Sequence, residues 1–171
     1  MYSEHETEAQ RYVITQACHF FLNELLPIKQ RRIIIHLYFN EKFEDDSHAE
    51  VDWVDTNILP NVYQVRFSRK VSKNILKIIK CLSHEMIHIK QFAKGELYDH
   101  LYEYTVKWKK VKFNNKDDDG YWERPWEIEA YRNEFPLFKK FMTKFGLTQK
   151  MIRENPTLCA EKISKTLADT P

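Results

Sequence analysis

The residues best suited to chemistry stand in one short segment, His84-Glu85-Met86-Ile87-His88. Histidines four residues apart lie on the same face of a helix, so both imidazoles can bind one metal ion. Zinc is commonly held by such a pair, and the glutamate beside the first histidine can act as a general base. The segment therefore predicts a zinc site with His84 and His88 as ligands and Glu85 as the catalytic base.

The residues around this segment predict the helix that must carry it. Apolar side chains recur at helical spacing between Ser72 or Lys73 and Gly95, in a stripe of Ile75, Ile79, Leu82, Met86, Ile89 and Ala93. His84, His88 and Gln91 fall roughly opposite this stripe. This placement favours histidines that line a cleft over the alternative, in which they are hydrogen-bonded residues without a metal.

A catalytic zinc site normally has three protein ligands and an open position for water. Gln91 and Lys94 occupy the positions of the glycine and third histidine in the pattern H-E-x-x-H-x-x-G-x-x-H, so the third ligand must lie further on. A predicted helix from Pro125 to about Phe135 carries Glu127 in the middle of an apolar arc. The arc comprises Trp126, Ile128, Ala130, Tyr131 and Phe135. A buried carboxylate needs a partner, so Glu127 is the expected third ligand.

Two other carboxylates on this predicted helix have different expected roles. Glu129 falls on the opposite side, with Arg132 and Asn133, and is expected to be a solvated surface charge. It remains the rival for the third ligand. Glu134 lies on the inner arc, where it can orient a histidine, although an ion pair at the rim is the favoured interpretation.

Together these motifs resemble those of zincin metallopeptidases of the gluzincin kind, in which a glutamate from a downstream helix joins the histidine pair. The resembling motifs are HEMIH and RPWEIEA, and the resemblance spans about residues 62–135. They are also similar to phage-type and SprT-like zincin proteins. The chain departs from the family at Tyr131, four residues after Glu127, where an aspartate or asparagine often stands.

The resemblance implies hydrolysis of a peptide or protein substrate, with one Zn²⁺ per chain activating water and Glu85 moving its proton to the leaving amine. It also implies that a strand before the active-site helix, expected at 61–68, borders the cleft and pairs with an extended peptide. Tyr131, Tyr121 and His100 are candidates for stabilising the oxyanion. Two alternatives stay open: a catalytically silent scaffold that binds a partner protein, and a DNA-associated protease.

The remaining elements predict a single zincin-like α+β domain over residues 1–171. A helix at about 7–26 should stop at Pro27, and strands at 31–40, 49–55 and 61–68 should form an antiparallel meander. A short hairpin can lie within 97–113. The expected sheet is small, three- to four-stranded and mostly antiparallel. Pro136 should kink or restart the third helix, and Thr148 and Thr157 can cap two short terminal helices.

Composition limits the other classes of function. The 171 residues carry 27 Lys and Arg against 25 Asp and Glu, so the net charge of +2 does not by itself favour nucleic acid. Basic residues do gather at 66–80 and 107–112, which leaves nucleic-acid contact possible but less favoured than a solvated face. Three cysteines, an acidic N-terminus and no long apolar run predict a cytoplasmic protein without membrane contact, in the host cytoplasm if phage-encoded. The oligomeric state stays open.

Overall fold

The computed structural model describes residues 7–27, 33–44, 46–100, 105–114 and 123–169, and it confirms the α+β class. The helices in these residues are α1 (Glu8–Leu25), α2 (Arg69–Ser72), α3 (Ile75–Ala93), α4 (Pro125–Lys144), α5 (Gln149–Glu154) and α6 (Pro156–Ala168). The strands are β1 (Ile34–Glu41), β2 (Ala49–Trp53), β3 (Val62–Ser68), β4 (Leu97–His100), β5 (Thr105–Trp108) and β6 (Val111–Asn114). None of the described helices is both long and apolar enough to span a membrane.

The first sheet has the order β1-β3-β2, so the predicted antiparallel meander is wrong. β1 pairs with β3 in parallel, and only β2 pairs with β3 in the antiparallel sense. β3 takes the central position because its inward side chains, Tyr63, Val65 and Phe67, are completely buried. β1 and β2 bury less of their surface and lie at the two edges.

The second sheet is a three-stranded antiparallel unit of β4, β5 and β6, where the sequence predicts at most a hairpin. Lys109 and Lys110 form the turn between β5 and β6 with positive φ angles. A separate small apolar cluster, built around Trp108 and Trp126, joins this sheet to the start of α4.

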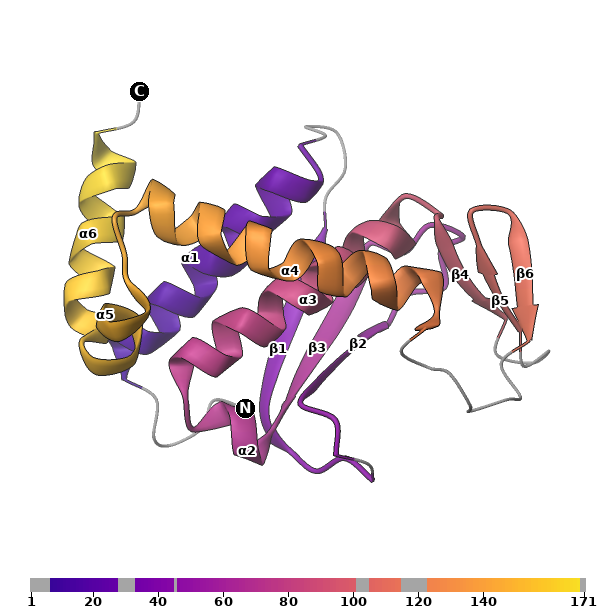
Figure 1. Cartoon of the computed structure of the whole chain (residues 1–171), viewed down its shortest axis with the longest axis horizontal. Coiled ribbons are helices and arrows are strands. Elements are labelled where there is room, and N and C mark those ends of the chain that lie inside the picture. Colours follow the sequence, from indigo (N-terminus) through magenta and orange to yellow (C-terminus); the bar gives the residue numbers. More distant parts are fainter. Residues whose placement is uncertain (1–6, 28–32, 45, 101–104, 115–122, 170–171) are drawn as a thin grey trace.

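Helix α3 is the buried centre of the molecule. It contacts β2 and β3, α1 and α4, and Figure 1 shows α4 crossing over it. Asn74 caps its first turn by accepting a hydrogen bond from the Lys77 amide, so α3 begins slightly later than predicted and follows the separate short helix α2. Gly95 ends it, as predicted, with a φ of +65° that favours glycine.

The C-terminal helices correct two predictions. Helix α4 runs through Pro136 to Lys144, because the residues beyond the proline pack into the core. The Phe141 ring there lies 5.7 Å from the rings of both Phe20 and Phe21 of α1, and such packing outweighs one lost backbone hydrogen bond. Thr148 caps α5 as predicted, but Asn155 rather than Thr157 caps α6.

Candidate metal centre

His84, His88 and Glu127 converge on one point between α3 and α4. The Nε2 atoms of the two histidines are 3.1 Å apart. Oε2 of Glu127 lies 3.4 Å from Nε2 of His84 and 3.5 Å from Nε2 of His88. Glu127 is only 3% exposed, in agreement with the prediction that it lies in a buried position and needs a partner. Across the described residues, this is the group of three side chains placed to hold a metal ion.

The three separations match those expected around a zinc ion. Ligand atoms about 2.0–2.1 Å from a tetrahedral zinc ion lie about 3.3 Å from one another. The observed 3.1, 3.4 and 3.5 Å therefore describe one face of such a tetrahedron. Two imidazoles and one carboxylate are also a donor set typical of catalytic zinc. The residues present fit the metal that the sequence predicts.

Each histidine has a second partner on its other ring nitrogen. Nδ1 of His84 lies 2.7 Å from Oε2 of Glu134, and Nδ1 of His88 lies 2.8 Å from Oε1 of Gln91. Both partners can only accept here, so both Nδ1 atoms carry hydrogen, and each Nε2 atom, when its imidazole is neutral, has a lone pair for a proton or a metal ion. Two lone pairs and a carboxylate oxygen then face one another, and only a proton or a cation can satisfy all three.

Glu134 thus contacts a histidine, as the alternative interpretation has it. Its side chain is 34% exposed and the contact is an ion pair when His84 is protonated, so the interpretation as a rim ion pair also holds in part. Gln91 was missed as a functional residue, since the sequence shows only that it shares the histidine face. Its complete burial is the signal that distinguishes it, and that burial depends on how α4 packs against α3.

Without a metal, the histidines of this site bind a proton more tightly than free histidine does. Burial alone would lower the pKa of His84, but the hydrogen bonds that it donates to the Glu127 and Glu134 carboxylates outweigh burial and raise the pKa to about 10. The pKa of His88 is also raised, because the interactions with Glu127 and Glu85 outweigh its burial. Below about pH 10 the imidazole of His84 therefore holds a proton that an incoming metal ion must displace.

This electrostatic state predicts the pH dependence of zinc binding. Zinc should release at least one proton per site, and its affinity should rise about tenfold for each pH unit between about pH 6 and pH 9. Calorimetric titrations in two buffers with different ionisation enthalpies measure the number of protons released. A binding enthalpy that is the same in both buffers, with an affinity independent of pH, would contradict the proton-holding site.

Glu85 lies beside the metal group on α3 and is buried, at 6% exposure. Burial raises the pKa of its carboxyl group. The two histidines oppose this shift, while the charges of Glu127 and of Glu50 on β2 add to it. A carboxylate with a raised pKa is better able to take up a proton, as a general base requires.

Two predictions about α4 need correction. Glu129 is not a solvated surface charge, because its side chain is 23% exposed and its carboxylate binds Lys90, Gln91 and Lys109. Burial raises the pKa of Glu129, but the Gln91 hydrogen bond and the two lysines outweigh it and lower the pKa. The predicted apolar arc is also wrong in part: three of its members are exposed, namely Ile128, Tyr131 and Phe135.

Tyr131 is the one oxyanion candidate whose side chain is described. Its ring centre lies 4.6 Å from that of His84. Burial raises the pKa of the Tyr131 phenol to about 12, aided by the charges of Glu127 and Glu134, so the hydroxyl keeps its proton at neutral pH. Tyr121 lies outside the described residues, and so does the side chain of His100.

The prediction that the strand at 61–68 pairs with an extended peptide is also wrong. β3 pairs on both sides, with β1 and with β2, so its backbone groups are already used. β2 lies at an edge of the sheet, with no strand beyond it among the described residues, and it contacts α3. An extended peptide could pair only with an edge of this sheet, and β2 is the edge whose Glu50 influences Glu85.

The predicted basic patch is partly neutralised by carboxylates. Ion pairs in the described part of the chain join Arg66 to Glu50 and Asp52, Lys70 to Asp46, and Lys109 to Glu129. Paired cations attract a phosphate backbone less than a free cluster does. The structure therefore adds no support to nucleic-acid contact, which stays a prediction.

Comparison of the chain with protein-family models, with curated proteins and with solved structures found no match.

Proposed function

We propose that this protein is a zinc-dependent peptidase of the zincin kind, with His84, His88 and Glu127 as ligands. The observation that carries the proposal is the spacing of the three ligand atoms, 3.1–3.5 Å, with both Nδ1 atoms engaged elsewhere. A bound zinc ion would supply Lewis acidity, which polarises a carbonyl group and makes water more acidic. All other parts of the reaction fall to side chains of the chain itself.

Glu85 is the proposed general base. Its carboxylate takes a proton from the attacking water as the carbon–oxygen bond forms, and returns that proton to the amine nitrogen as the carbon–nitrogen bond breaks. The raised pKa of Glu85 supports this role, because a buried carboxylate accepts a proton more readily. Tyr131 is the proposed donor to the oxyanion, since its protonated hydroxyl belongs to a ring that contacts His84.

The proposed substrate is a peptide in extended conformation. β2 is an edge strand of the first sheet and contacts α3, and an edge strand suits strand addition by an extended peptide. Flexible segments of proteins, which can take up an extended conformation, are therefore the expected substrates.

The test is a screen of peptides derived from a digested proteome, incubated with zinc-loaded protein and analysed by mass spectrometry. We expect new peptide ends to appear with loaded protein, to disappear after a chelator removes the metal, and to return when zinc is restored. The matched control is His88→Ala protein treated in the same way. Zinc binding without any cleavage would overturn the peptidase proposal in favour of a silent scaffold, and cleavage only with added DNA would favour the DNA-associated alternative.

A further inference from the structure

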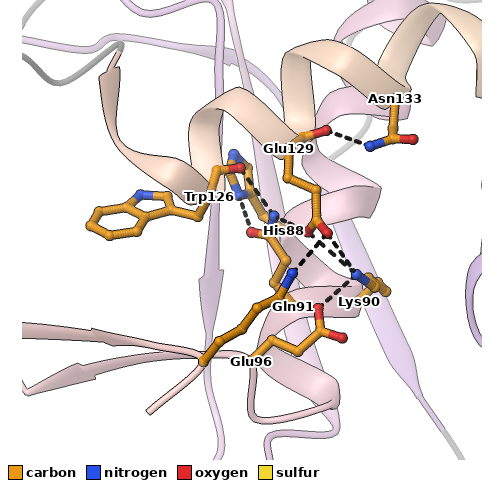
Figure 2. A network of polar contacts seen from close by, with 8 residues as sticks. His88, Lys90, Gln91, Glu96, Trp126, Glu129 and Asn133 are labelled. Carbon is orange, nitrogen blue, oxygen red and sulfur yellow. Dashed lines mark hydrogen bonds and ion pairs between the residues drawn. The ribbon is translucent and has the colours of Figure 1, made fainter. Parts of the chain in front are cut away.

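Gln91 is a completely buried polar side chain whose amide is fully used. Its Oε1 lies 2.8 Å from Nδ1 of His88, and its Nε2 donates to the carbonyl oxygen of Trp126 at 3.0 Å and to Oε2 of Glu129 at 2.8 Å. Figure 2 shows these three bonds: the first lies within α3, and the other two join α3 to the first turns of α4. No hydrogen of this amide is left to donate elsewhere.

The partners of Nε2 fix which way the amide points. A backbone carbonyl and a carboxylate can only accept hydrogen bonds, so an amide turned by 180° would place its oxygen against two acceptors. Oε1 must therefore face His88, and Nδ1 of His88 must donate to it. The hydrogen of His88 is held on Nδ1, and the lone pair of Nε2 is directed toward the other two ligand atoms.

Glu129 is itself held firmly against Gln91. Its carboxylate lies 3.3 Å from Nζ of Lys90 and 3.3 Å from Nζ of Lys109. Lys90 also pairs with Glu96 at 2.6 Å, just before β4, and its side chain is only 15% exposed. Figure 2 shows Lys90 between the two carboxylates. The chain of contacts runs from the second sheet through Glu129 and Gln91 to His88.

We propose that Gln91 is a positioning residue that fixes the tautomer and ring orientation of His88, and that Glu129 acts through Gln91. This inference rests on the proposed metal centre. The two histidines are then held by different groups. The Glu134 carboxylate contacts His84 directly, whereas His88 contacts the neutral amide of Gln91, whose orientation depends on the Glu129 carboxylate. Loss of such an outer partner typically weakens metal binding by about 10–100-fold.

The experiment compares wild-type protein with Gln91→Met, which keeps the length of the side chain and removes its hydrogen bonds. Zinc affinity is measured by competition with a chromophoric chelator, and the Nδ1–H signals of both histidines are followed by NMR in the loaded protein. We expect about 10–100-fold weaker binding and fast solvent exchange of the His88 Nδ1–H. The His84 signal should be unchanged, because Glu134 holds it, and it serves as an internal control.

Variants of Glu129 separate positioning from folding. Glu129→Leu should weaken zinc binding by about 10-fold, at the lower end of the range, and Glu129→Gln should restore it because a glutamine oxygen can still accept from Gln91. Lys140→Met, which removes an exposed ion pair with Glu24 away from the metal group, is the control and should bind zinc as wild type does. If Gln91→Met does not fold, the Glu129 series decides the question.

The possible results distinguish the proposed metal centre from the proposed positioning role of Gln91. If wild-type protein binds zinc but Gln91→Met or Glu129→Leu keeps both its affinity and the slow His88 signal, the positioning role is overturned and the metal centre stands. If wild-type protein binds no zinc, the metal centre fails and this inference fails with it.

Discussion

Replacing Glu85 with glutamine should reduce peptide hydrolysis by about 10²–10⁴-fold, the usual contribution of a general acid–base residue, while zinc stays bound. The amide has the shape of the carboxylate but cannot take up a proton from water. His84, His88 and Glu127 are untouched by the change, so the metal content should remain at wild-type level. Rates of peptide cleavage and elemental analysis of the same samples give the two measurements.

The same substitution should not destabilise the protein. Burial raises the pKa of Glu85, so its charged form is less favourable in the folded chain than in the unfolded chain at neutral pH. A neutral glutamine avoids that penalty, and the melting temperature should be equal to or higher than that of the wild type. Lost activity with unchanged or increased stability indicates a residue retained for chemistry.

Glu24→Gln is the matched control, because it removes a carboxylate that pairs with Lys140 on the surface, away from the metal group. It should change the cleavage rate by less than twofold, since exposed ion pairs contribute little. A Glu85→Gln protein that cleaves peptides at the wild-type rate would rule out Glu85 as the base. Equal loss in both variants would point to a general effect on the fold.

The three candidate ligands could be predicted from the sequence because each is marked by the residues near it on its own helix. His84 and His88 lie one helical turn apart, so any helix over this segment brings them together. Glu127 could be predicted because it shares a helix face with Trp126 and Ala130, which are buried, and a buried carboxylate needs a partner. The structure brings these three side chains to one point, and Glu127 reaches it because α4 packs against α3.

The partners of the histidines could not be predicted, because they depend on the angle and register at which α4 crosses α3. Gln91 and Glu134 are ordinary polar residues until that crossing places them beside Nδ1 of a histidine. Glu129 shows the same limit: the helical wheel places it away from Glu127, yet the second sheet and Lys90 cover that side. A helical wheel gives the faces of a single helix and does not show which other elements pack against each face.

Sheet order was unpredictable for a similar reason. The alternating patterns of β1, β2 and β3 identify strands, but local spacing does not say which strand becomes central. The complete burial of Tyr63, Val65 and Phe67 decides in favour of β3, and burial on this scale requires α3 to cover the sheet. The choice matters for the proposed function, because it places β2 rather than β3 at an edge of the sheet.

Replacing Glu127 with glutamine should lower zinc affinity by more than about 100-fold, beyond the range for loss of an outer partner. We expect about one zinc ion per wild-type chain and almost none in the variant after dialysis against a mild chelator. The amide is a poorer ligand than a carboxylate, and it no longer balances the charge of the metal beside two neutral imidazoles. Elemental analysis gives the metal content, and chelator competition gives the affinity.

Glu129→Gln is the matched control, because Glu129 lies two residues away on the same helix and is the rival ligand. It should keep its zinc, since the carboxylate of Glu129 contacts Gln91 and two lysines, while Glu127 lies within 3.5 Å of both histidines. Loss of zinc in Glu129→Gln with retention in Glu127→Gln would exchange the two assignments. Retention in both variants would mean that neither carboxylate is a ligand and that the histidines bind metal with another partner.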